Sequence, residues 1–151
     1  MYISKRFKLY EIMDYETYES YKHREQAGWK RFDPILLKYI DDLMDALELE
    51  YKRKLYIVCN NWHWKEDNPW QWRGCRTPGS QYYRENSGHS LREDRLVTAL
   101  DFDVNGLTPK QIQDFIEKHK HEEWCTVRGI ETGVAWNHHD TMHRIAYFKP
   151  N

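Results

Sequence analysis

Histidines and carboxylates in separate parts of the chain are the residues best suited to chemistry. The sequence has eight histidines in 151 residues, which is a high proportion. Several of them lie in the stretch Trp136–His143, and His89 follows a Ser-Gly pair much earlier in the chain. Asp101 lies between these segments, inside an apolar run. Imidazole and carboxylate groups brought together from separate segments are typical ligands of a catalytic zinc ion, which keeps its fourth position for water.

A zinc ion held in this way would support hydrolysis. It lowers the pKa of its bound water to about 7, so hydroxide is available at neutral pH. A nearby carboxylate can take the remaining proton and pass it to the leaving group. Asp140, three residues before His143, is a candidate for that proton transfer. Asp101 is a candidate ligand, because an aspartate in the middle of a buried strand is costly unless it is paired or metal-bound.

Simpler explanations exist for each of these residues taken singly. His89 can be an ordinary loop histidine, because most matches to short motifs are false. The stretch 138–143 can be a polar turn rather than a site. Asp101 can cap a turn, or pair with Arg128 or Arg144 instead of a metal ion. The order of the segments along the chain is therefore more informative than any one of them.

Composition narrows the classes of protein to consider. The 24 acidic and 23 basic residues give a net charge of −1, which argues against a protein held to nucleic acid or to an anionic membrane by bulk charge. No apolar run approaches the ~20 residues of a membrane-spanning helix. The first residues lack the apolar stretch of a secretory signal, so we expect a chain made in the cytoplasm. An odd number of cysteines without a C-x-x-C pair favours reduced thiols over a disulfide framework.

The elements that must position these residues are those of an α+β domain covering residues 1–151. We expect helices packed on a small, mostly antiparallel sheet, preceded by a lead-in over residues 1–33 with one short helix. Apolar residues at helical spacing after Asp33-Pro34 predict a helix over 34–48. A capping box predicts a second helix from Thr108. Short apolar runs predict strands near 55–59, 97–104, 126–131 and 142–148.

The segment between residues 60 and 88 is rich in Asn, Trp, Pro and Gly and predicts a long surface loop. Such a loop is uncommon in a small domain unless it has a function. Its tryptophans, between Trp62 and Trp72, can form a wall against a substrate, since flat rings suit sugar and peptide surfaces. Packing of the loop against the rest of the chain explains them equally well.

Four short motifs follow one another in a suggestive order. They are Arg73-Gly-Cys-Arg-Thr-Pro78, Ser87-Gly-His89, Ala99-Leu-Asp101 and Asp140-Thr-Met-His143. In this order they resemble the D-Ala-D-Ala carboxypeptidase family of zinc peptidases, which includes phage and bacterial endopeptidases that cut cell-wall peptides. The start Arg6-Phe-Lys-Leu-Tyr-Glu11 and the helix over 34–48 are similar to one branch of that family. The resemblance implies a Hedgehog or D-Ala-D-Ala peptidase-like fold.

The resemblance also implies roles for individual residues. It implies a Zn²⁺ ion with three protein ligands, which are His89, Asp101 and His143. Asp140 would be the catalytic base. Arg76 would hold the substrate near the metal, where a guanidinium can grip a carboxylate or stabilise an oxyanion. Ser87 would be structural or would contact the substrate, and His63, His138 or His139 could orient the ligands.

The implied function is zinc-dependent hydrolysis of peptidoglycan stem-peptide bonds, by an endolysin-like or a D,D-carboxypeptidase-like enzyme. The expected partner is the peptidoglycan peptide, with neither nucleic acid nor membrane. A chain without a secretory signal would reach the cell wall only on release, as from a phage.

Two other functions compete with this one. The link between His89 and Asp101 is longer than the family's usual link. The same scaffold could therefore be catalytically altered and serve as a phage structural or partner-binding module. The histidine-rich turn at 137–143 also suggests a metal-dependent nuclease, although the balanced charge speaks against a basic face for phosphate.

Overall fold

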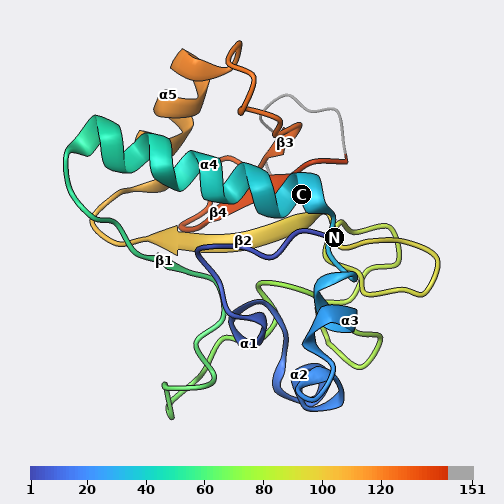
Figure 1. Cartoon of the computed structure of the whole chain (residues 1–151). Helices are drawn as coiled ribbons and strands as arrows, with labels where there is room; N and C mark the ends of the chain where they lie inside the picture. Colours follow the sequence, from blue (N-terminus) through green and yellow to red (C-terminus); the bar gives the residue numbers. More distant parts are fainter. Residues whose placement is uncertain (143–151) are drawn as a thin grey trace.

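The computed structural model describes residues 1–142 of the chain. Within them five helices accompany a small antiparallel sheet of four strands, which confirms the α+β class (Figure 1). The helices are α1 (Leu9–Ile12), α2 (Tyr15–Tyr21), α3 (Glu25–Trp29), α4 (Pro34–Tyr51) and α5 (Pro109–His119). The strands are β1 (Ile57–Val58), β2 (Ala99–Val104), β3 (Gly129–Ile130) and β4 (Asn137–Asp140).

The sheet has the strand order β1-β2-β4-β3, and every pairing in it is antiparallel. Asp101 of β2 lies opposite His138 of β4. Because side chains alternate across a strand, these two residues point to one face of the sheet. Phe102 and His139 are fully buried on the other face, where their rings meet edge to face. The sheet therefore separates the core from a polar face.

The long helix α4 lies across the sheet and supplies much of the core (Figure 1). Asp33 caps its start by accepting a hydrogen bond from the Ile35 backbone N–H, and Pro34 occupies the first turn. The helix ends at Tyr51 and is followed by Lys52, whose backbone is left-handed with φ 52°. The predicted helix over 34–48 is confirmed and extends to Tyr51.

The lead-in over residues 1–33 is more ordered than predicted, because it contains three short helices in place of one. Its first residues are attached to α4 through the buried carboxylate of Asp41. That carboxylate accepts hydrogen bonds from the Tyr2 hydroxyl at 2.8 Å, the Ser4 hydroxyl at 2.7 Å and the Lys5 backbone N–H at 2.7 Å. Burying a carboxylate is tolerated here because several donors satisfy it.

The strand predictions differ from the structure mainly at β4. The predicted strands near 55–59, 97–104 and 126–131 appear as β1, β2 and β3 with shorter bounds, and the helix after Thr108 appears as α5. Residues 137–140, predicted as a polar turn, form β4 instead. Although their sequence is polar, these residues pair with β2 on one side and with β3 on the other. Of the predicted strand over 142–148, all but Met142 lies outside the described residues.

The long segment from 60 to 88 contains no helix or strand, as predicted, yet hydrogen bonds hold it against the lead-in. The Asn60 side chain donates to the Met13 carbonyl at 3.0 Å and accepts from the Arg73 backbone N–H at 3.0 Å. The Trp62 indole N–H donates to the same Met13 carbonyl at 2.8 Å. No helix within residues 1–142 has the length and apolar character required to cross a membrane.

Candidate metal centre

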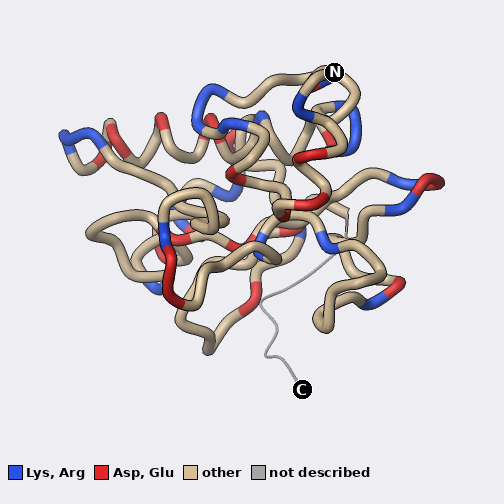
Figure 2. The backbone as a smooth tube through the Cα atoms, turned by 90° about the horizontal axis from the view of Figure 1, so that it is seen from below, with Lys and Arg blue, Asp and Glu red and all other residues tan. Residues whose placement is uncertain are grey.

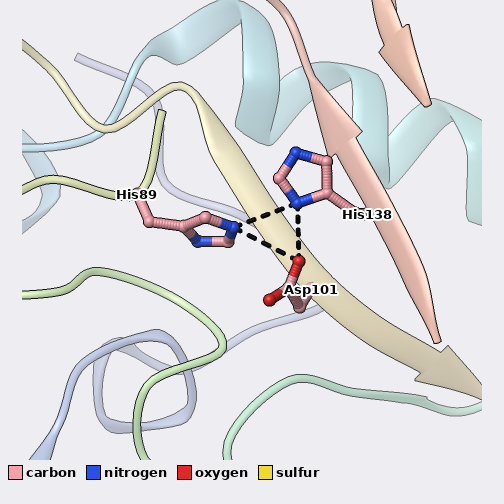
Figure 3. A group of neighbouring side chains, drawn as sticks. All are labelled: His89, Asp101 and His138. Carbon is pink, nitrogen blue, oxygen red and sulfur yellow. Dashed lines mark hydrogen bonds and ion pairs between the residues drawn. The ribbon is translucent and has the colours of Figure 1, made fainter. Parts of the chain in front are cut away.

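Three ligand atoms from distant segments meet on the polar face of the sheet (Figure 3). His89 comes from the loop before β2, Asp101 from the middle of β2 and His138 from β4. The Nδ1 of His138 lies 2.7 Å from the Oδ1 of Asp101, and the Nε2 of His89 lies 3.2 Å from the same oxygen. The two imidazole nitrogens are 3.1 Å apart. The three side chains thus direct their donor atoms to one point.

This donor set fits a small divalent cation. Ligand atoms about 2.0–2.1 Å from a tetrahedral zinc ion stand ~3.3 Å from one another, close to the separations found here. Two imidazoles and one carboxylate are also a combination typical of zinc. All three residues line a cleft of about 680 Å³, so one side of the group is open to a small molecule.

The proton on the His89 ring is fixed by the backbone. Its Nδ1 lies 2.7 Å from the carbonyl oxygen of Gly74, and a carbonyl can only accept. Nδ1 therefore carries the hydrogen, and Nε2 directs its lone pair toward Asp101 and His138. Burial lowers the pKa of His89 below its ordinary value, which keeps the ring neutral. A backbone acceptor behind a ligating histidine is a common arrangement in metal sites.

The remaining charges favour an ionised Asp101. Burial alone would raise the pKa of this carboxyl, but the neighbouring histidines, through the hydrogen bond from His138 Nδ1, hold it well below the usual range. Burial would likewise lower the pKa of His138, yet its hydrogen bond to Asp101 and the nearby carboxylates raise it above the ordinary value. A proton therefore lies between Asp101 and His138, and a metal ion would displace it.

We call His89, Asp101 and His138 the metal-binding group, because they could hold a metal ion, and the structure places Arg76 against it. Its Nη2 donates to the Oδ2 of Asp101 at 2.7 Å, and its Nε donates to the Trp72 carbonyl at 2.7 Å. Arg76 also lines the cleft. It therefore occupies one oxygen of Asp101 and leaves the other to face the two histidines. The sequence suggested Arg128 or Arg144 as the partner of Asp101, and the structure shows Arg76 in that role. Arg144 lies outside the described residues.

The longer link between His89 and Asp101 does not move His89 away from the site. The Gly88 carbonyl accepts hydrogen bonds from the backbone N–H groups of Thr98 at 2.8 Å and Ala99 at 3.2 Å. These bonds close the link at its base, so the intervening residues form a loop whose two ends remain adjacent. The additional length changes the surface beside the cleft while the ligand geometry is kept.

Two further predicted residues, Ser87 and Asp140, line the same cleft. The Ser87 hydroxyl accepts a hydrogen bond from the His89 backbone N–H at 3.2 Å and so stabilises the turn before that ligand. Asp140 is buried, and its Oδ1 accepts from the Met142 N–H at 2.7 Å. A Cβ on Gly88 would lie 2.5 Å from the other Asp140 oxygen, so glycine is required there.

Most of the predicted site is therefore brought together around one cleft. The predicted residues found there are Arg76, Ser87, His89, Asp101 and Asp140. His143, the third predicted ligand, lies outside the described residues. Among those that are described, the third donor atom belongs to His138, which the sequence suggested only as a residue that orients ligands. Recognising β4 as a strand would have identified it, since His138 and Asp140 then share a face.

Sequence reasoning missed Glu131, which also lines the cleft. Its backbone N–H donates to the His138 carbonyl at 3.2 Å, so it continues the β3–β4 pairing directly across from that histidine. Asp101, His138 and Glu131 thus form a row across three adjacent segments on one face. Burial raises the pKa of Glu131 above its ordinary value. A single glutamate at the end of a predicted strand gave no signal by itself.

Known proteins give no direct guide to this site. Neither family models, nor curated proteins, nor solved structures match the chain. The resemblance of its motifs to zinc peptidases therefore stays a prediction. The functional inference rests on the ligand geometry and on the cleft around it.

Proposed function

We propose that this chain is a zinc-dependent metallopeptidase acting on peptidoglycan stem peptides, with a Hedgehog or D-Ala-D-Ala peptidase-like fold. The observation that carries the proposal is the convergence of His89 Nε2, Asp101 Oδ1 and His138 Nδ1, all within 3.2 Å of one another. The order of the motifs along the chain supplies the substrate class. The open cleft supplies the space for a peptide.

Zinc is favoured over harder cations by the donor atoms. Magnesium and calcium prefer sets composed of oxygen, whereas two of the three donors here are imidazole nitrogens. Three protein ligands are typical of catalytic zinc, since structural sites use four. When bound, zinc would supply an activated water at neutral pH.

The surrounding residues have distinct tasks in this proposal. His89, with its proton held by Gly74, and His138 present nitrogen lone pairs to the metal. Arg76 keeps Asp101 ionised and oriented, and its positive charge at the cleft can stabilise an oxyanion on the substrate. Asp140 would take a proton from the attacking water and pass it to the leaving amine.

The role of Asp140 can be separated from that of Glu131. We expect Asp140→Asn to lower kcat about 10²–10⁴-fold, the usual effect of removing a general base, while the zinc content stays unchanged. Glu131→Gln, the matched carboxylate on the adjacent segment, should have a smaller effect. Steady-state hydrolysis of a muropeptide together with metal analysis measures both. The reverse ranking would assign the proton transfer to Glu131.

The function itself is tested by metal content and hydrolysis. Protein purified without added metal should contain close to one zinc per chain, and it should release cleaved peptide from purified muropeptides. His89→Ala should lose both properties. Absence of zinc, or zinc that persists in His89→Ala, would refute the proposal. Zinc without cleavage of any muropeptide would favour a partner-binding module on the same scaffold.

Zinc affinity should fall as the pH is lowered, and the fall should begin above pH ~6.5, the ordinary histidine pKa. His138 has a raised pKa, so protons compete for its Nδ1 at higher pH than for a free histidine. Each zinc bound between pH ~6.5 and the raised pKa therefore releases one proton.

In metal-free protein, His138 should make the free energy of unfolding decrease as the pH rises, whereas zinc affinity increases. Stabilisation by protonated His138 is complete below the unfolded pKa of ~6.5 and is lost as the pH rises through the folded pKa.

For the zinc prediction, competition with a chromophoric chelator measures the affinity of zinc at each pH. An affinity that stays flat down to ~pH 5 would argue against imidazole ligation.

A nuclease is disfavoured by the distribution of charge. Figure 2 shows Lys and Arg interspersed with Asp and Glu along the described chain. The two arginines that line the cleft are also both paired with aspartates. A phosphate backbone would find little attraction there.

A further inference from the structure

The cleft extends beyond the metal-binding group to a set of aromatic side chains. We call this set the aromatic rim, and it consists of Trp70, Trp72, Tyr82 and Trp136, all of which line the cleft. Trp70 is 42%, Tyr82 52% and Trp136 37% exposed. Large rings left open to water around a cleft are typical of a binding surface.

The tryptophans of the long loop differ in whether they line the cleft. Trp62 packs inward, where its N–H binds the Met13 carbonyl and its ring meets Tyr15 at 5.4 Å. Trp64 is 62% exposed and does not line the cleft. Trp70 and Trp72 line it. Loop packing therefore explains Trp62, whereas Trp70, which Arg73 and Lys65 of the loop also contact, lines the cleft.

The aromatic rim lies beside the metal-binding group, along β2. Asp103 is two residues beyond Asp101 on the same face, ~7 Å further along the strand. The Arg73 guanidinium binds Asp103 at 2.7 Å and lies over the Trp70 ring, 4.2 Å from its centre. Trp136 directly precedes Asn137, which pairs with Phe102 of β2. Both tryptophans therefore lie toward the Asp103 end of the cleft.

Trp70 is held in place before any ligand arrives. Its carbonyl accepts hydrogen bonds from the backbone N–H groups of Asn61 at 2.9 Å and Trp62 at 3.2 Å, and its own N–H donates to the Asn61 side chain. The stacked Arg73 restrains the ring. A ring fixed in this way costs little entropy on binding, which favours affinity.

Apart from its histidines, the charged residues that line the cleft are carboxylates and two paired arginines. Asp101, Glu131 and Asp140 contribute carboxyl groups to its lining. The arginines that line it, Arg73 and Arg76, are each neutralised by an aspartate. Away from the metal-binding group, this lining therefore offers a nucleic acid or a phosphate little attraction. A neutral ligand with an apolar face and polar edges suits rings at an open rim.

We propose that the aromatic rim is a saccharide subsite, which binds a sugar ring of a glycan strand beside the peptide held at the metal-binding group. A pyranose presents an apolar C–H face to an indole and hydroxyl groups at its edge. Gln71, Tyr82 and Glu131 supply polar groups near the rings. The proposal rests on the proposed function, since it gives the peptidase a substrate that carries its glycan.

The test measures saccharide binding separately from hydrolysis. A soluble tetramer of N-acetylglucosamine should bind saturably and change the tryptophan fluorescence, with metal present or removed by a chelator. Trp70→Ala and Trp136→Ala should each weaken binding about tenfold or more, because each removes one stacking ring. Trp64→Ala, the exposed tryptophan outside the cleft, is the matched control and should bind as the unaltered chain does.

A second variant covers loss of structure at Trp70. Trp70→Phe keeps a ring for Arg73 and should bind more tightly than Trp70→Ala, with unfolding temperatures compared for all variants. The lack of saturable binding to the tetramer, or equal affinity in Trp70→Ala, Trp136→Ala and Trp64→Ala, would overturn the proposal. Tighter binding to a single-stranded oligonucleotide than to the tetramer would also overturn it.

Failure of this subsite and failure of the proposed function give different results. If the chain cleaves a glycan-free stem peptide but does not bind the tetramer, the subsite proposal alone is wrong. If the tetramer binds and no peptide is cleaved, the subsite stands and the peptidase proposal is wrong. If both hold, KM should be lower for a peptide that carries its disaccharide, and Trp136→Ala should remove that difference.

Discussion

Replacing His138 by alanine should weaken zinc binding about a hundredfold or more. The binding free energy of a zinc site, about 10–16 kcal/mol in small domains, is shared among few ligands, so the loss of one is severe. His138 contributes an atom 2.7 Å from Asp101 and 3.1 Å from His89, which no other described histidine does. Zinc content after dialysis and the dissociation constant from chelator competition measure the effect.

Two matched variants make this result decisive. His63→Ala should keep zinc, because the His63 ring lies against Tyr10 at 4.7 Å and is not part of the metal-binding group. His143→Ala tests the ligand that the motif resemblance implies. If His143→Ala loses zinc while His138→Ala retains it, the assignment of His138 as the third ligand is wrong.

Replacing Gly74 by alanine should destabilise the chain and empty the metal site, although Gly74 is not itself a ligand. An added Cβ would lie 2.6 Å from the carbonyl carbon of Ile12 and nearer still to its oxygen, and backbone atoms cannot rotate away. The Cys75 N–H, next in the chain, donates to that Ile12 carbonyl at 3.0 Å. The clash would displace the Gly74 carbonyl from His89 Nδ1, so the ligand would lose its fixed orientation.

We expect a loss of about 3 kcal/mol in the free energy of unfolding, which corresponds to roughly 10 °C in Tm for a chain of this size. Zinc affinity should fall about 10–100-fold, the usual effect of removing a group that orients a ligand. Gly79→Ala is the control, because a Cβ there meets nothing within 4 Å. Equal Tm and zinc affinity in the two variants would contradict this role of Gly74.

The parts of the fold that were predicted from the sequence have strong local signals. The helix α4 has a capping aspartate, a proline in its first turn and apolar residues at helical spacing, and α5 has a capping box at Thr108. The alternation of β2, which sets Asp101 on the face opposite Phe102, was also readable. Such signals need no knowledge of distant contacts.

The parts that were not predicted depend on pairing between distant segments. β4 consists of Asn-His-His-Asp and has no apolar alternation, yet it pairs with strands on both sides. Its His139 is buried against Phe102 and accepts or donates a hydrogen bond with the Tyr39 hydroxyl at 2.9 Å. Only the tertiary partners of β4 explain why a polar segment forms a central strand.

The candidate site shows the same division. His89, Asp101 and Arg76 were predicted from the order of short motifs, and the structure brings all three together. The position of His138 required the register of β4 on β2, which places this residue opposite Asp101. Glu131 likewise lines the cleft because its backbone pairs with His138, and no sequence motif predicts that pairing.

The dependence of Gly74 on Ile12 has a consequence for biosynthesis. The turn that orients His89 is supported by a residue near the beginning of the chain, whereas the third donor atom comes from residue 138. During translation, a ribosome-bound nascent polypeptide could not hold an ion at this group until residue 138 has been synthesised. Loading with metal should therefore be a late event, after contacts of high sequence separation have formed.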